Sequence, residues 1–556
     1  MKTTKRTAAF LMTAAMLLTL LCACGGGGEE TPEEEQFDLR VCVQGEPSVL
    51  DPAMAGAAGK SVMYHLFENL MRLSDDGDGV AKLDYGIASG HTVTENEDGT
   101  ETYVFDLRET ARWSDGTKLT ASDFVFAWRR LANPKTESPN HTLLSGIVGY
   151  DEVREGGDTS TLAVNAENKY TLSVTLKAHD PYFLENVCTA VATMPLRRSI
   201  VEDSGGTWDS GAAGFVSNGP YMLESWRRGE RMALRVNEGY HEAKRLGPDT
   251  IQFFFASDAE AYALYQNGEV DFVEDLPEDV LRELSLQEDW TATPLAATYT
   301  VLINNLVSPL DIETIREALS LSIDCDAVAA AAEAGSVAAA GLVPYGIADG
   351  EDSEDDFRTV GGALHGARTE DYVENCSQAR LRMSGTEYPG GQGFPPIEYI
   401  YEAGGANDAV AKALQTMWKE SIGVNVVLRG VSAEELAAAL SGKTYQLAGL
   451  RVGATINDAF GFLGMWRSDS AENYISYSNE TYDVLLGVAE HSLNSNARAA
   501  FMHDAESLLI DDEVLLPLYY YANSSLLREE LAGVYCDVMG NYYFRNVHET
   551  AAGNAA

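Results

Sequence analysis

The apolar run from Phe10 to Leu21 sets the first limit on how this 556-residue chain folds. The run is about a dozen residues long, whereas a membrane-spanning helix needs about 20. Lys2, Lys5 and Arg6 precede it and small residues follow it, which is the pattern of a secretory signal. No later stretch reaches about 18 uninterrupted apolar residues, so we expect the rest of the chain to fold outside the bilayer.

The end of this run, Leu21-Cys22-Ala23-Cys24, resembles a bacterial lipobox. The resemblance implies cleavage after Ala23 and a lipid on Cys24, whose thiol is the nucleophile for a diacylglyceryl group. Residues 1–23 are then a signal peptide, and residues 24–36 are a flexible acidic tether. Two or more acyl chains give stable anchoring, so we expect attachment to the extracytoplasmic face of the cell membrane. A plain signal peptide with incidental cysteines is the alternative.

Length and charge narrow the class of protein further. The chain is too long for one ordinary hydrophobic core, so we expect two or three lobes. Hydrophobic residues make up 45% of the sequence, which is enough for a sizeable core. The net charge of −46 repels phosphate backbones, so nucleic-acid binding is not expected.

The remaining cysteines are odd in number and widely spaced, with no C-x-x-C pair. They are Cys42, Cys188, Cys325, Cys376 and Cys536. This spacing is neither a disulfide framework nor a zinc pattern. We expect small buried hydrophobic residues, although one disulfide remains open.

Hydrophobic periodicity predicts both strands and helices. Alternation predicts strands, and a capping box at 120–123 predicts a helix with Phe124, Trp128 and Leu131 on one face. The predicted strands include 39–43, 103–107, 170–176, 424–428 and 515–521. The other predicted helices are 259–267, 309–323, 326–333, 407–421 and 497–509. Strands and helices alternate irregularly, which favours mixed α/β lobes.

Eight groups of motifs follow one another between residues 37 and 548. They are EPSVLDP at 46–52, YVFDLR with WSDG at 103–116, TASDFVFAW at 120–128, YTLSVTL with PYFL at 170–184, SNGPY at 217–221, YQNGEVD at 265–271, PLDIETIREALSLSID at 309–324 and PLYY at 517–520. In this order they resemble the large extracellular solute-binding proteins of peptide ABC transporters, the oligopeptide- and dipeptide-binding family. Trp113, Trp128 and Tyr221 within them are expected to pack cores.

The resemblance implies an α/β fold of two hinged lobes, the periplasmic-binding-protein-like fold of type II with an extra subdomain. Lobe I would span 37–300, with the extra subdomain at about 79–207. Lobe II would span 301–520, the chain would return to lobe I over 521–548, and 549–556 would be a tail. The lobes would close over a ligand between them. Backbone edges in the cleft would pair with an extended peptide.

One segment departs from the family pattern. Peptide-binding members carry a segment like Arg-Ala-Gly-Trp-x-x-Asp-Tyr, whose Asp pairs with the peptide ammonium, whose Trp packs near the ligand backbone and whose Arg can meet a carboxylate. The corresponding segment here reads GLRVGATIND at 449–458. Gly449, Val452 and Thr455 stand at the Arg, Trp and Asp positions. A hydroxyl cannot supply the charge that a buried ammonium needs.

Three interpretations follow. In the first, Asp458 pairs with the peptide ammonium in place of the missing Asp. In the second, the ligand lacks a free amino end, because it is blocked, cyclic or not a peptide. In the third, this copy binds weakly and serves mainly as a surface protein. If the segment is extended, Arg451 points the same way as the missing Arg and can meet a ligand carboxylate. A surface arginine is the alternative. The predicted ligand-binding residues are Arg451, Thr455, Asn457 and Asp458.

The predicted function is the membrane-anchored substrate-binding component of an ABC importer, a monomer that captures oligopeptides or a peptide-like solute. Its partners would be the ligand, the permease and ATPase subunits, and the membrane through the lipid anchor alone. We find no H-E-x-x-H, G-x-S-x-G or P-loop motif, and we expect no enzymatic activity, cofactor or metal. The alternatives are a peptide-signal receptor, a binder of chelated metal, haem or another non-peptide ligand and, more distantly, an extracellular hydrolase.

Overall fold

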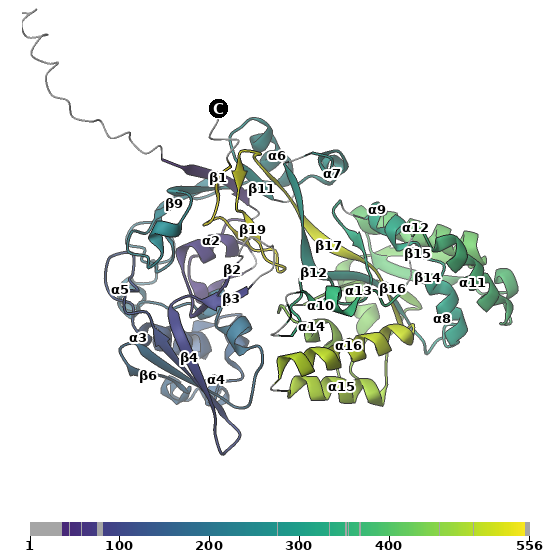
Figure 1. The fold of residues 1–556 in the computed structure, drawn as a ribbon, viewed down its shortest axis with the longest axis horizontal. Helices are drawn as coiled ribbons and strands as arrows, with labels where there is room; N and C mark the ends of the chain where they lie inside the picture. Colours follow the sequence, from purple (N-terminus) through teal and green to yellow (C-terminus); the bar gives the residue numbers. More distant parts are fainter. Residues whose placement is uncertain are drawn as a thin grey trace, which may run out of the picture. The chain divides into compact units, whose positions relative to one another are not determined.

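Two long antiparallel strands, β12 (Trp290–Ile303) and β17 (Leu515–Leu527), lie side by side through the middle of the fold (Figure 1). The computed structural model describes residues 36–550 apart from positions 44, 57, 75–81, 275, 288, 333, 351, 352, 354, 366–368, 455 and 493. The signal peptide, Cys24 and nearly all of the tether, Thr455 and most of the tail therefore lie outside the described residues. From Asp38 onward the chain forms one unit.

The β12–β17 pair joins two groups of strands into one mixed sheet. In the described residues this sheet has 11 strands, in the order β15-β14-β16-β12-β17-β11-β1-β10-β9-β8, with β13 also paired to β17. The other strands of the sheet are β1 (Asp38–Val43), β8 (Tyr221–Arg227), β9 (Arg231–Val236), β10 (Thr250–Phe255), β11 (Phe272–Glu274), β13 (Val337–Ala338), β14 (Ile397–Glu402), β15 (Val426–Val431) and β16 (Leu447–Gly453).

Register shows how the two groups are connected. At one end of the pair, Phe272 of β11 lies opposite Leu527 of β17. Because β11 also pairs with β1, this contact joins β1 and its neighbours to the sheet. At the other end, Ile303 of β12 lies opposite Leu447 of β16. Because β16 also pairs with β14, this contact joins β14 and β15 to the sheet. The group around β1 is called lobe I and the group around β14 lobe II below. The predicted boundaries at 300 and 520 fall inside the connecting strands.

A second sheet lies inside the predicted extra subdomain. Its order is β4-β5-β7-β6, and helix α3 packs against β6 and β7. The bounds are α3 (Ala121–Ala132), β4 (Ala88–Glu95), β5 (Glu101–Leu107), β6 (Val164–Asn168) and β7 (Thr171–Leu176). The capping box predicted at Thr120 and Asp123 is present, and Phe124, Trp128 and Leu131 are buried as predicted.

The remaining elements in this half of the chain, and in the segment that returns to it, are short. The helices are α2 (Lys60–Leu66), α4 (Tyr150–Arg154), α5 (Arg198–Asp203), α6 (Asp258–Gln266) and α7 (Glu278–Leu284). The strands are β2 (Met71–Ser74), β3 (Lys82–Tyr85), β18 (Leu531–Ala532), β19 (Tyr535–Cys536), β20 (Tyr542–Tyr543) and β21 (His548–Glu549). Tyr542 bonds to Ser61 and Phe544 to His65, so the end of the chain packs beside α2.

Helices enclose the strands of lobe II in two hydrophobic clusters. They are α8 (Glu313–Ser320), α9 (Cys325–Ala331), α10 (Phe357–Gly361), α11 (Tyr372–Ser384), α12 (Gly405–Ile422), α13 (Ala433–Ser441), α14 (Phe460–Leu463), α15 (Glu480–Glu490) and α16 (Ser495–Asp511). The helix predicted to begin at Pro309 begins at Glu313, because turns such as the one closed by the bond from the Ile312 amide to the Pro309 carbonyl precede it.

Side-chain burial agrees with the expectations from composition. Trp113, Trp128 and Tyr221 are at most 1% exposed. The five cysteines are buried, as predicted, and form no disulfide with one another. Among the described residues, no helix combines the length and apolarity that crossing a membrane requires.

Candidate ligand-binding site

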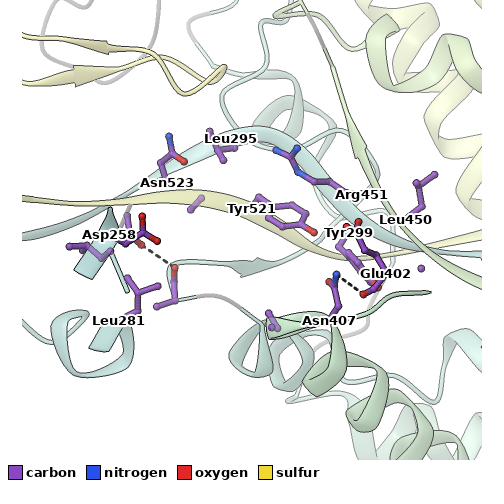
Figure 2. Close-up of a pocket in the computed structure, with 18 of the residues that line it drawn as sticks. Asp258, Leu281, Leu295, Tyr299, Glu402, Asn407, Leu450, Arg451, Tyr521 and Asn523 are labelled. Atoms are coloured by element: carbon purple, nitrogen blue, oxygen red, sulfur yellow. Dashed lines mark hydrogen bonds between the residues drawn. The ribbon is translucent and has the colours of Figure 1, made fainter. Parts of the chain in front are cut away.

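Three adjoining cavities lie in the fold, two of them beside β12, β16 and β17. The first, which we call the hinge cavity, has a volume of about 690 Å³ and is lined by these strands and by residues near the starts of α6 and α12 (Figure 2). The central cavity, of about 820 Å³, is lined by the end of β1, the start of α2, the end of β16 and residues 538–541. The lateral cavity, of about 440 Å³, is lined by residues around 182–192 and by Ile456, Asn457 and Asp458.

Shared lining residues show that the three cavities border one another. Those common to the hinge and central cavities are Leu295, Arg451 and Asn523. Those common to the central and lateral cavities are Lys60, Met539 and Asn541. Lys60 belongs to lobe I and Arg451 to lobe II, so the combined space lies between residues of both lobes.

The connecting strands are irregular where they border this space. Pro294 pairs with Ala522 and Thr298 with Tyr520, so the three residues 295–297 on β12 face Tyr521 alone on β17. A bulge of this kind interrupts the ladder and bends a strand. Leu295 and Tyr521 line the hinge cavity. The bulge therefore interrupts the backbone hydrogen bonding between β12 and β17 at the point where the two lobes are joined.

Strand β16 presents an open edge to the same space. Its parallel partner β14 pairs with Leu447 and Ala448 alone, whereas β12 pairs with β16 from Leu447 to Gly453. Along its second edge, the stretch from Gly449 to Gly453 has no partner strand among the described residues. Gly449, Arg451 and Gly453 line the cavities. Unpaired backbone groups of this kind can accept an added strand.

Gly449 lets two tyrosines meet across β16. Tyr299 of β12 and Tyr399 of β14 are nearly fully buried, and their hydroxyl oxygens lie 3.0 Å apart. A Cβ atom at position 449 would overlap both oxygens. The Arg position of the family segment is therefore closed to a side chain here, because the tyrosine pair fills the space above it.

We expect Gly449→Ala to lower the free energy of unfolding by about 1–3 kcal/mol, the usual cost of overpacking. Urea unfolding followed by fluorescence would measure the change. Gly487→Ala is the control, since a Cβ at that position of α15 meets no atom within 4 Å and alanine favours helix. The double change Tyr299→Phe and Tyr399→Phe should relieve the loss at position 449. Equal stability of the Gly449 and Gly487 variants would contradict the steric argument.

Arg451, the first of the predicted ligand-binding residues, is exposed and lines both the hinge and the central cavity. Its guanidinium carbon lies 5.0 Å from the centroid of the Tyr521 ring, a cation–π contact (Figure 2). Val452, at the family's Trp position, is 2% exposed and belongs to the core of lobe II. Arg451 and Val452 therefore point to opposite faces of β16, as the strand period requires.

Asn457 and Asp458 lie at the lateral cavity, and both are largely buried. Asp458 accepts two hydrogen bonds from Arg498, at 2.5 and 2.9 Å, and one from the Tyr182 hydroxyl at 3.2 Å. Burial and the nearby Glu185 carboxyl raise the pKa of Asp458, whereas the hydrogen bond that the Phe460 amide donates to it lowers this pKa. Both carboxylate oxygens of Asp458 are thus engaged by protein groups.

Sequence reasoning missed the partners of these residues. Arg498 also donates to the Tyr182 hydroxyl and lies over the Tyr182 ring, and Asn457 bonds to Glu185. Tyr182 was visible as part of the PYFL motif, and Arg498 as a residue of the helix predicted over 497–509. No spacing in the sequence joins residues about 300 positions apart. The contact links lobe II to the predicted extra subdomain.

Burial raises the pKa of Glu185 from its usual value of 4.5 to about 7, and the hydrogen bond from Asn457 acts in the opposite direction. Between these two pH values the folded protein keeps a proton that the unfolded chain has released. The stabilising contribution of protonated Glu185 is therefore present below about pH 4.5 and is lost as the pH rises through about 7.

We expect Glu185→Gln to remove this pH dependence. Relative to the variant, the wild type should lose up to about 3 kcal/mol of unfolding free energy between pH 4.5 and pH 7. Denaturant unfolding of both proteins across this range would give the difference. Glu152→Gln, a change at an exposed carboxylate, serves as the control. Parallel pH profiles of wild type and Glu185→Gln would contradict the prediction.

Among the described residues, no group of three or more His, Cys, Asp or Glu side chains is arranged to hold a metal ion. The cavities instead combine an open strand edge, aromatic rings and a few charged groups. This arrangement can hold a solute by backbone hydrogen bonds and side-chain contacts.

Comparison with known proteins agrees with this geometry. The sequence model described as bacterial extracellular solute-binding proteins, family 5 Middle, matches residues 82–474, which is more than half of the chain. The chain belongs to family 5 of the bacterial extracellular solute-binding proteins. This family is the one that the eight motif groups predicted. The oligopeptide-binding protein OppA of Bacillus subtilis is 28% identical over 521 residues, and the match covers 92% of each chain.

Solved structures of peptide-binding proteins share the fold. The periplasmic murein tripeptide-binding protein MppA, in an unliganded open form, is 25% identical with a TM-score of 0.81, covering 93% of this chain and 98% of that one. OppA of Haemophilus influenzae, in complex with the peptide RPPGFSPFR, is 25% identical with a TM-score of 0.62, covering 93% and 99%. The predicted two-lobed α/β solute-binding fold is confirmed.

Proposed function

We propose that this family 5 protein is the extracytoplasmic substrate-binding component of an ABC importer and captures oligopeptides or a peptide-like solute by lobe closure. The observation that carries the proposal is the open edge of β16 beside the cavities. An extended peptide offers regularly spaced N–H and C=O groups that can pair with this edge. A ligand that contacts both lobes favours their closed arrangement by its differential affinity.

The proposal includes the setting in which the protein works. Lipidation of Cys24 would hold it at the cell membrane, and the closed, liganded monomer would dock on permease and ATPase subunits. Binding without catalysis is part of the proposal, so a bound peptide should be released intact. The net charge of −46 argues against nucleic acid as a partner.

Native mass spectrometry of the protein purified from its own cell tests the proposal, because it weighs whatever is bound in the cavities. A bound peptide supports the proposal. The peptide identified would then be titrated by calorimetry and recovered for mass analysis. A bound solute that is neither a peptide nor peptide-like, or cleavage of the peptide, would overturn the proposal.

The engagement of Asp458 by Arg498 favours a ligand whose amino end is not held at this position. We expect N-acetylation of a bound peptide to change its dissociation constant by less than about threefold, since no buried charge pair is lost. Calorimetry with the free and acetylated forms of the same peptide measures the ratio. A loss of about a hundredfold or more on acetylation would show that an ammonium is recognised.

A further inference from the structure

Two basic side chains face the central cavity from different lobes. Lys60 is the first residue of α2 and Arg451 lies on β16, and both are exposed. Neither forms an ion pair with a carboxylate of the described residues. Both therefore have donors that remain for a ligand.

Unpaired cations in one cavity are unexpected in a chain with a net charge of −46. Elsewhere in the molecule, Arg72, Arg358 and Arg498 each hold at least one carboxylate. Glu274 is the single acidic residue among the described residues that line the central cavity. The central cavity thus has a net positive lining in a strongly acidic protein.

The contact of Arg451 with Tyr521 positions the guanidinium without using its N–H donors. The attraction acts between the cation and the face of the ring, whereas the N–H donors lie in the guanidinium plane. Gly453, two residues further along the open edge of β16, lines the same cavity. A ligand strand added to this edge would pass beside Arg451.

Lobe closure would strengthen such a contact. Exposed charges are screened by water and salt, so Lys60 and Arg451 attract an anion weakly while the cavity is open. Exclusion of water lowers the local dielectric constant and increases the attraction between opposite charges. An anionic ligand group between these residues would also offset the repulsion between them.

We propose, building on the proposed function, that the central cavity selects ligands that carry a carboxylate, which Lys60 and Arg451 hold between them. The carboxylate comes from an acidic side chain or from the C-terminus of a peptide. Lys60 and Arg451 are both exposed rather than part of a hydrophobic core. Their replacement therefore tests recognition without removing core packing.

Calorimetry with matched tetrapeptides tests this selection. One set carries a single glutamate at each position in turn of an amidated alanine tetrapeptide, and the matched set carries glutamine. A third comparison uses tetra-alanine with a free and with an amidated C-terminus. We expect one or more of the carboxylate-bearing peptides to bind about tenfold or more tightly than its neutral partner, with the preference falling as salt is added.

Variants of the full chain assign the preference to residues. Lys60→Met and Arg451→Met should each reduce it to about threefold or less, while binding of the neutral peptides is retained. Lys169→Met and Arg198→Met are the controls, since these exposed cations lie over Tyr170 and Phe126, away from the cavities. Lys60→Gln and Arg451→Gln repeat the test with uncharged polar side chains.

The outcomes separate this inference from the proposed function. A preference for glutamate assigns the carboxylate to an acidic side chain, and a preference for the free C-terminus assigns it to the peptide end. Equal binding of charged and neutral peptides overturns the inference and leaves the proposed function in place. A preference that persists in the Lys60 and Arg451 variants overturns the assignment to these residues. Binding of no peptide in any set overturns both.

Discussion

Replacing Glu506 by alanine is expected to lower the free energy of unfolding by about 3–5 kcal/mol. Glu506 and Arg358 form an ion pair of 2.8 Å in lobe II, and their side chains are 0% and 1% exposed. The same carboxylate oxygen accepts the Val343 amide at 2.8 Å. Alanine would leave the Arg358 guanidinium buried without its counter-charge. Denaturant unfolding followed by circular dichroism would measure the loss.

The control is Glu490→Ala, which removes the partner of Arg467 from a pair whose side chains are 43% and 24% exposed. Water replaces an exposed partner, so this change should cost less than about 1 kcal/mol. The double variant Glu506→Met and Arg358→Met should recover much of the loss, because no buried charge remains. Equal stability of Glu506→Ala and Glu490→Ala would contradict the expectation.

Asp458→Ala is expected to destabilise the ligand-free protein by a similar amount, about 3–5 kcal/mol. The change leaves Arg498, whose side chain is 7% exposed, without the carboxylate that it contacts through two nitrogens. It also removes an acceptor from the Tyr182 hydroxyl. Thermal and denaturant unfolding without ligand would measure the effect.

The same variant separates two roles for Asp458. If Asp458 holds a ligand ammonium, as one interpretation of the sequence has it, Asp458→Ala abolishes binding while the stability of the ligand-free protein is retained. If Asp458 mainly neutralises Arg498, the ligand-free protein loses stability and the change Asp458→Leu with Arg498→Met restores much of it. Calorimetry with a free-N-terminus peptide, beside the unfolding data, decides between them.

The elements that the sequence predicted well are those with a local cause. Alternation of apolar and polar residues predicted β1, β5 and β7, and the Thr120–Asp123 capping box predicted the start of α3. Predictions shifted where a turn intervened. The helix predicted over 309–323 begins at Glu313, after a turn that the hydrogen bond from the Ile312 amide to the Pro309 carbonyl closes.

The site was partly visible in the sequence. The segment 449–458 was selected because it departs from the family pattern, and its described residues Arg451, Asn457 and Asp458 do lie beside the cavities. Their roles as ligand contacts stay predictions. Nothing in the sequence indicated that Lys60 lines a cavity, because an isolated lysine after a glycine is typical of any exposed surface. Its place in the same cavity as Arg451 depends on how α2 packs in the folded chain.

The sequence by itself determined the family, the mixed α/β class and most strands and helices, because these depend on the order of residues within short windows. The tertiary structure alone decided that Tyr299 and Tyr399 fill the space over Gly449, and that Arg498 takes the carboxylate of Asp458. It also decided that Lys60 and Arg451 share one cavity. Such relations join residues far apart in the chain, and their energies depend on burial and distance, which exist once the chain has folded.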